Sequence, residues 1–269
     1  MPQFLDCQGL AQMNNRPSHR NQIVDQFTRQ AIPFQQTHRS AESALRLAVA
    51  LSQVSEADEV LDVACGPGVV ASALAGIAQH VIGIDITPAM LEHARNLQRE
   101  RRLHNLVWCL GDVARLPFSD GTFSLVVSRY AVHHFEQPKD VVREMARVCR
   151  ANGRVMLIDS APPAEQADAF NDSERMRDPS HTRALTPDQL HALMHAAGLD
   201  ITTSHLYAWE VPARALLDRS FPLPGDETKL LQRYESDVGV DRLGMNARVL
   251  DGVLHVTFPT LIAVGTPLG

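Results

Sequence analysis

The sequence has 269 residues, of which 45% are hydrophobic, and a formal net charge of -6. This length suits one large α/β domain or two small ones, and the acidic balance lacks the overall positive field of a nucleic-acid-binding protein. No apolar run approaches the roughly 20 residues of a membrane-spanning helix, and the polar start contains no apolar signal core. We therefore expect a cytoplasmic protein with a flexible start over residues 1–20. The four scattered cysteines predict no metal site.

Regular elements are predicted from residue 21 onward. Apolar residues at helical spacing predict helices over 21–31 and 41–52, the second with Ser40 as N-cap. Strands and helices alternate from residue 59. The predicted strands are 60–64, 81–84, 106–110, 123–128 and 154–159, and the predicted helices between them are 69–78, 88–100 and 138–150. This alternation predicts a mostly parallel sheet that is covered by helices on both faces.

The second half of the chain is less regular. A helix is predicted over 187–197, a strand over 201–207 and a last strand over 253–264. The long stretch between these two strands, 208–252, contains prolines, glycines and two helical patches. Because a connection of this length is usually functional or a small subdomain, we predict an inserted cap over the carboxyl edge of the sheet.

A glycine loop follows the first predicted strand. Gly66 and Gly68 lie between that strand and a helix, where a ligand can approach the backbone and the unpaired N–H groups of the helix start. The loop by itself also fits a dinucleotide site, and Asp85, about twenty residues on, could chelate a ribose in either case. Asp62 is more specific, because a carboxylate inside a strand is costly to bury unless a positively charged ligand or loop N–H groups accept it. Further along, Asp112 could accept a hydrogen bond from an adenine amino group and the Val113 N–H could donate to the ring.

Four segments extend this pattern over residues 60–159. They read VLDVACGPG, VIGIDITPAMLEHAR, GDVARLPFSDGTFSLVVSRYAVHHF and VVREMARVCRANGRVMLIDS. In this order and spacing they resemble the class I S-adenosylmethionine-dependent methyltransferases of the type 11 group, which includes the ubiquinone/menaquinone biosynthesis C-methyltransferases. The segments RYAVHHF and RDPSH resemble those of small bacterial methyltransferases but indicate no substrate. The resemblance implies a Rossmann-like seven-stranded sheet whose last strand is antiparallel.

The resemblance also implies the cofactor S-adenosylmethionine, the product S-adenosylhomocysteine and a set of contact residues. Asp62, Ala64, Gly66 and Gly68 would hold the methionine part of the cofactor. Asp85 would bind the ribose hydroxyls, and Asp112 with Val113, after the third strand, would bind the adenine. In chain order the set is Asp62, Ala64, Gly66, Gly68, Asp85, Ile86, Met90, Gly111, Asp112, Val113 and Arg129. Two positions depart from the pattern: Ala64 stands where a glycine is common, and Ser124 stands where an aspartate is usual.

The catalytic candidates follow the fourth predicted strand. His133 or His134 could act as a base or orient the acceptor, or both could shape the pocket and support the loop. Tyr130 could contact the substrate or serve in packing.

The substrate candidates come from two other segments. Arg177 and His181, with Arg175 and Arg183, could anchor a carboxylate or phosphate of the acceptor, or the arginines could form an ion-pair network with neighbouring acidic residues. On the first helix, Phe27 and Gln30 could contact the cofactor or substrate, or belong to the core. Arg214 and Arg219 in the inserted stretch are predicted to be solvated.

The function predicted from these patterns is transfer of a methyl group from S-adenosylmethionine to a small-molecule acceptor in the biosynthesis of a cofactor or specialised metabolite. The accepting atom, carbon, oxygen or nitrogen, stays open, as does homodimer formation. We expect a single domain over 21–269, with a helical lid over 21–55. One alternative is a protein of the same fold that binds the cofactor but has other chemistry. Another is a nicotinamide-dependent oxidoreductase, which would explain the glycine loop and Asp85 but not Asp62 or the later motifs.

Overall fold

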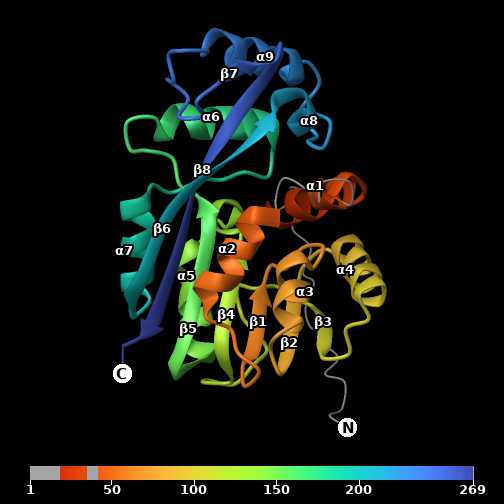
Figure 1. Cartoon of the computed structure of the whole chain (residues 1–269), viewed down its shortest axis with the longest axis vertical. Coiled ribbons are helices and arrows are strands. Elements are labelled where there is room, and N and C mark those ends of the chain that lie inside the picture. Colours follow the sequence, from red (N-terminus) through yellow and green to blue (C-terminus); the bar gives the residue numbers. More distant parts are fainter. Residues whose placement is uncertain (1–18, 35–41, 269) are drawn as a thin grey trace.

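The computed structural model describes residues 19–34 and 42–268 (Figure 1). The proposed cap residue Ser40 and residues 1–18 lie outside this range. The central sheet has the order β3-β2-β1-β4-β5-β8-β6, and β7 adds an eighth strand through pairing with β8. The strands are β1 Glu59–Val63, β2 His80–Asp85, β3 Leu106–Leu110, β4 Phe123–Arg129, β5 Cys149–Ser160, β6 Leu199–Pro212, β7 Arg248–Leu250 and β8 Val253–Pro267.

Strands β1 to β5 pair in parallel, whereas β8 runs antiparallel to both β5 and β6. The predicted Rossmann-like sheet with an antiparallel last strand is thereby confirmed. Its helices are α1 His19–Phe34, α2 Glu42–Ser52, α3 Val69–Ala75, α4 Pro88–Arg101, α5 Pro138–Val148, α6 Ala167–Arg177, α7 Pro187–Ala196, α8 Ala213–Leu217 and α9 Asp226–Ser236, with a short 3-10 helix, η1, at Val132–His134. None of the helices in the described ranges is long and apolar enough to cross a membrane.

Two buried apolar clusters lie on the two faces of the sheet. One joins sheet residues to Met145 of α5 and Met194 of α7, and the other joins them to Ala48 of α2 and Leu74 of α3. Burial of these faces removes apolar surface from water and holds the helices against the strands. The expected helices on both faces are therefore present.

The boundary between α5 and β5 differs from the prediction. The helix predicted over 138–150 ends at Val148, and β5 begins at Cys149 rather than at 154. Phe123 of β4 pairs with Cys149 and Leu125 pairs with Arg154, so β5 contains an irregularity between these pairs. Gly153 is required there, since an added Cβ would lie 2.7 Å from the Cys149 Sγ. The Asn-Gly pair thus marks a bulge inside the strand and not the end of a helix.

The inserted cap is carried by an extension of two strands. Pairing of β5 with β8 ends at Ser160 and Thr260, whereas β6 and β8 continue to pair as far as Pro212 and His255. Figure 1 shows this extension rising beyond the sheet, with α6, α8, α9 and β7 gathered around its end. These elements share a core of their own that includes Phe170, Tyr234 and Phe258. The insert between the last two strands is confirmed, although β6 runs five residues past its predicted end at Tyr207.

Candidate cofactor and acceptor site

A cavity of about 730 Å³ lies at the carboxyl ends of β1, β2 and β4. Helix α1, the loops after these strands, α6 and the cap contribute side chains to its wall. Its volume is in the range of small-molecule sites, and its position at the carboxyl edge is where open α/β sheets bind ligands.

The glycine loop after β1 forms one wall of the cavity. Gly66 lines the cavity, has a φ of +52°, and would place an added Cβ in space with no atom within 4 Å. Gly68 has a different role, because an added Cβ would lie 2.3 Å from the Trp108 ring. Ala64 has a φ of 55°, in the left-handed region where an L side chain is disfavoured. The alanine at this usual glycine position therefore strains the loop.

Ser124, the second departure from the family pattern, supports the start of β1. Its hydroxyl donates to Asp58 at 2.6 Å and accepts from the Glu59 N–H at 3.0 Å. Asp58 in turn forms an ion pair with Arg154 at 3.0 Å. Ser124 therefore connects the start of β4 to the start of β1 through Asp58 and the Glu59 backbone.

Asp62 presents a buried carboxylate to the cavity. The residue is 1% exposed, and its Oδ2 accepts from the Ala71 N–H at 3.0 Å. Burial, together with the negative charge of Asp85, raises the pKa of Asp62 to about 7 against the opposing effects of the Ala71 bond and Arg129. A positively charged ligand group would favour the ionised form, so the site fits the ammonium group of the implied cofactor.

Asp85 ties the end of β2 to the glycine loop. Its Oδ2 accepts from the Gly66 N–H and its Oδ1 from the Thr87 N–H, both at 2.8 Å. Burial raises the pKa of this carboxyl in spite of these bonds. Each oxygen keeps a lone pair, so the carboxylate can also accept from a ribose hydroxyl.

The other implied cofactor residues are mostly distributed around the same cavity. Its wall includes Ile86, Met90, Asp112, Val113 and Arg129, whereas neither Gly111 nor Gly68 of the glycine loop is part of it. Arg129 also has a buried Nε with no hydrogen-bond partner among the described residues. This unpaired donor, the open space at Gly66 and the Asp62 carboxylate together fit S-adenosylmethionine.

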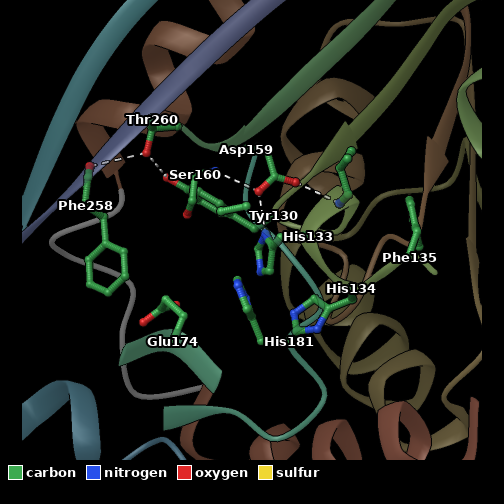
Figure 2. A network of polar contacts seen from close by, with 12 residues as sticks. Tyr130, His133, His134, Phe135, Asp159, Ser160, Glu174, His181, Phe258 and Thr260 are labelled. Atoms are coloured by element: carbon green, nitrogen blue, oxygen red, sulfur yellow. Dashed lines mark hydrogen bonds and ion pairs between the residues drawn. The ribbon is translucent and has the colours of Figure 1, made fainter. Parts of the chain in front are cut away.

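A histidine–aspartate pair lies at the end of β4. The Nδ1 of His133 on η1 is hydrogen-bonded to Asp159, and both residues are buried (Figure 2). The carboxylate also accepts from the N–H groups of Val132 and Ser160, each at 2.7 Å. Burial alone would lower the pKa of His133, but the charge and hydrogen bond of Asp159, together with the charge of Glu174, outweigh it and the net pKa is raised. Nε2 is then the ring nitrogen that can take up a proton.

His134 and His181 lie beside this pair without sharing its arrangement (Figure 2). The Nδ1 of His134 is 3.1 Å from the Ser180 carbonyl oxygen, and burial followed by the charge of His133 lowers its pKa to about 4. His134 is therefore neutral and donates to that carbonyl. The Nε2 of His181 contacts the Asn171 Oδ1 at 2.7 Å, and this ring does not line the cavity.

Tyr130 lines the cavity with its hydroxyl directed to the antiparallel strands. The hydroxyl is 2.9 Å from that of Tyr207 on β6 and 3.1 Å from that of Thr260 on β8. The Arg129 guanidinium lies over its ring at 4.6 Å. These contacts join the end of β4 to the base of the cap.

The basic residues after β5 do not converge on one ligand. Arg177 binds both oxygens of the buried Glu174, at 2.7 and 2.8 Å, and also donates to Ser220. Arg175 and Arg183 form more exposed ion pairs with Asp172 and Asp168. This arrangement is the ion-pair alternative considered from the sequence. Asp178, which follows α6, instead accepts from Gln30 of α1 at 2.9 Å. Gln30 and Phe27 both line the cavity, and Phe27 meets the His134 ring edge-on.

Comparison with known proteins agrees with this geometry. A family model described as a methyltransferase domain, of type 11, matches residues 61–157. The uncharacterized methyltransferase YcgJ of Bacillus subtilis is 34% identical over 170 residues, which are 62% of this chain and 66% of YcgJ. The crystal structure of YcgJ matches with a TM-score of 0.77 at 25% identity, over 84% of this chain and 99% of that one. The chain belongs to the class I S-adenosylmethionine-dependent methyltransferases.

Two further methyltransferases show the same relationship. The ubiquinone/menaquinone biosynthesis C-methyltransferase UbiE of Pseudomonas putida (strain W619) is 29% identical over 184 residues, covering 60% of this chain and 72% of UbiE. A structure from Bacillus halodurans C-125 described as a methyltransferase matches with a TM-score of 0.76 at 27% identity, over 83% of this chain and 98% of that one. The sequence match to YcgJ spans slightly less than two thirds of that protein's length.

Several residues in or beside the cavity of this methyltransferase were not predicted from the sequence. Asp159 does not line the cavity itself but binds His133, which does, and it had a sequence signal, because like Asp62 it is a carboxylate at the end of an apolar strand. Trp209 and Arg219 had none, and Arg219 was expected to be solvated but lines the cavity instead. Among the residues that the structure describes, no group of three or more His, Cys, Asp or Glu side chains could hold a metal ion.

Proposed function

We propose that the chain transfers a methyl group from S-adenosylmethionine to a small organic acceptor whose accepting atom must lose a proton, and that His133 takes up this proton. The observation that carries the proposal is that His133, which is hydrogen-bonded to the buried Asp159, lines the same cavity as Asp62 and Asp85. When bound, the cofactor supplies an electrophilic methyl group on a sulfonium. The chain itself must align the acceptor with this methyl group, exclude water and remove a proton from the acceptor.

Each part of that work has a candidate group. Asp62 would receive the ammonium of the methionine part, Asp85 the ribose hydroxyls, and Asp112 with Val113 the adenine. The Nε2 of His133 would accept the proton of the acceptor, and the Asp159 carboxylate would stabilise the imidazolium that forms. His134 is a weaker candidate for the base, since burial holds its pKa at about 4. Tyr130 would orient the acceptor and not exchange a proton with it, because its hydroxyl is already hydrogen-bonded to two other side chains.

The need for a base favours a hydroxyl or an acidic carbon over a neutral amine, which has a free electron pair before transfer. The relatives include methyltransferases named for quinone biosynthesis, which supports a small biosynthetic intermediate as the acceptor. The nicotinamide alternative has no such support. The second alternative, a cofactor-binding protein of the same fold with other chemistry, is separated from our proposal by product analysis.

The test has two steps. Calorimetry with the purified chain should detect binding of S-adenosylmethionine and of S-adenosylhomocysteine. Incubation with S-adenosylmethionine and a panel of phenols, carboxylic acids and amines should then release S-adenosylhomocysteine, measured by mass spectrometry, with at least one phenol. If neither cofactor form binds, the proposal fails; if both bind and no acceptor releases product, the cofactor-binding alternative is favoured.

A further inference from the structure

Arg219, just after α8, differs from the other arginines of the cap and of α6. Arg214 forms ion pairs with Asp218 and Glu227, and Arg177 binds Glu174. Arg219 lines the cavity and has no carboxylate partner among the residues that the structure describes. Its guanidinium is therefore a partly buried positive charge that no carboxylate in the ranges 19–34 and 42–268 neutralises.

The surroundings of Arg219 favour the binding of an anion beside its guanidinium. Burial and the positive charge of Arg177 lower the pKa of Arg219 to about 10. Glu174, which also lines the cavity, is not available to Arg219, since both of its oxygens are bound to Arg177. A carboxylate or phosphate entering this end of the cavity would form charge-assisted hydrogen bonds with a guanidinium that is already partly desolvated.

A wall of aromatic rings connects Arg219 to the catalytic end of the cavity. The guanidinium lies 5.8 Å from the centre of the Trp209 ring, and Trp209 stacks on Phe258 at 4.8 Å with an angle of 14° between the rings. The Tyr130 ring is 6.4 Å from Trp209 and begins the segment that leads to His133. All of these side chains line the cavity. A flat apolar molecule could contact this wall between the base and the arginine.

We infer that Arg219 binds an anionic oxygen group of the acceptor, a carboxylate or a phosphate, while the body of the acceptor lies against Trp209 and Phe258. The inference rests on the proposed function, because it assigns the acceptor end of the same cavity. It names the substrate class as a small, flat organic acid. It also moves the anion anchor from Arg177, which Glu174 already neutralises, to Arg219.

Binding of simple probes tests this assignment without any methyl transfer. The probes are 4-hydroxybenzoate and phenyl phosphate, with methyl 4-hydroxybenzoate as the uncharged control. Fluorescence titration is suitable because the chain has two tryptophans, Trp108 and Trp209, and Trp209→Phe identifies the source of the signal. At least one acid should bind more tightly than the ester, and the relative affinity of the two acids distinguishes a carboxylate site from a phosphate site.

The variants Arg219→Met, Arg219→Lys and Arg214→Ala complete the test. Arg219→Met should raise the Kd of the acid at least tenfold and leave the ester unchanged, Arg219→Lys should retain part of the affinity, and Arg214→Ala should bind like the wild type. Unchanged binding of S-adenosylhomocysteine, measured by calorimetry, shows that Arg219→Met is folded. The inference is overturned if no acid binds better than the ester or if Arg219→Met binds the acid as the wild type does. Failure of the wild type to bind either cofactor form would instead count against the proposed function alone.

Discussion

Two buried carboxylates at strand ends are stabilised to different degrees by this protein. Asp159 has a histidine partner and two backbone donors, so its charge raises the pKa of His133. Asp62 has one backbone donor and no cation in hydrogen-bond contact among the described residues, so burial raises its own pKa to about 7. We interpret Asp62 as a residue whose ionised form is costly until a positively charged ligand binds.

Replacement of Asp62 by Asn should therefore stabilise the ligand-free protein and weaken cofactor binding. The folded pKa of Asp62 is raised, so its contribution to stability decreases as the pH rises from the ordinary carboxyl pKa of 3.8 to about 7. At pH 8 we expect Asp62→Asn to gain about 1 kcal/mol or more, roughly 2–4 °C in Tm for a chain of this size. Thermal melts measure the gain, and calorimetry should show at least a tenfold loss in affinity for S-adenosylhomocysteine.

The pH dependence of that gain is the control for Asp62→Asn. It should shrink as the pH falls from 7 toward 4, because the wild-type carboxyl then takes up its proton in the folded state. An equal gain in Tm at pH 4 and pH 8 would contradict the assigned cause.

The His133–Asp159 pair predicts the pH dependence of methyl transfer. His133 must be neutral to accept a proton, and its pKa is raised above the ordinary value of 6.5. The value of kcat/KM should therefore rise with pH to a plateau, and the midpoint of this rise should lie above pH 6.5. Asp159→Asn removes the charge that opposes burial and should move this midpoint below 6.5. His133→Asn should lower kcat roughly 100-fold. The measurement is a pH profile with any acceptor that releases S-adenosylhomocysteine.

Cofactor affinity serves as the control for both substitutions. If His133→Asn retains wild-type kcat and an unchanged pH profile, His133 is a pocket-shaping residue and not the base. Loss of S-adenosylhomocysteine binding in either variant would indicate that the loop after β4 has moved.

At the scale of elements, α6 shows how charges can attach a helix to a neighbouring subdomain. Its sequence ADAFNDSERMR has a weak apolar pattern, and we did not predict a helix there. In the structure Phe170 enters the core of the cap, while Arg177 and Glu174 form a buried ion pair that reaches Ser220 after α8. The helix is therefore stabilised mainly by tertiary contacts, as is common for helices of this length.

Removal of one partner from this pair should destabilise the fold. Arg177→Ala leaves the Glu174 carboxylate buried without its cation, and breaking such a pair costs roughly 3–5 kcal/mol. We expect a correspondingly lower Tm and denaturation midpoint. Arg175→Ala is the matched control, because its pair with Asp172 is more exposed and contributes about 1 kcal/mol at most.

A double replacement, Arg177→Met with Glu174→Met, should recover part of the lost stability since no unpaired charge is left. If Arg177→Ala melts like the wild type, the pair is not a stabilising link between α6 and the cap.

At the scale of the whole molecule, the cavity is a product of three separate parts of the chain. The sheet contributes the acidic strand ends, α1 lies over one side, and the extension of β6 and β8 carries the cap above (Figure 1). Helix α1 alone contributes His19, Arg20, Ile23, Phe27 and Gln30 to the wall. We propose that α1 acts as the lid expected from the sequence.

Cofactor binding should therefore protect α1 more than elements remote from the cavity. Addition of saturating S-adenosylhomocysteine should slow amide hydrogen exchange in α1 and in the loop at residues 112–114, because ligand contacts stabilise the closed state. Helix α7 is the internal control, since it packs on the sheet and contributes no residue to the cavity. Equal protection in α1 and α7 would speak against a lid.

The sequence by itself determined the fold class and the family of this protein. Period-two and helical patterns are local, and four motifs in register place Asp62, Gly66 and Asp85 at the ends of adjacent strands. The tertiary structure decided which side chains share the cavity. The pairing of His133 with Asp159 joins residues 26 positions apart, and the bond from Arg177 to Ser220 joins residues 43 positions apart. The place of Arg219 in the cavity wall likewise depends on how the cap folds back over the sheet. Such contacts depend on how strands and helices pack, and on charges that meet only after burial, so no local pattern of the sequence contains them.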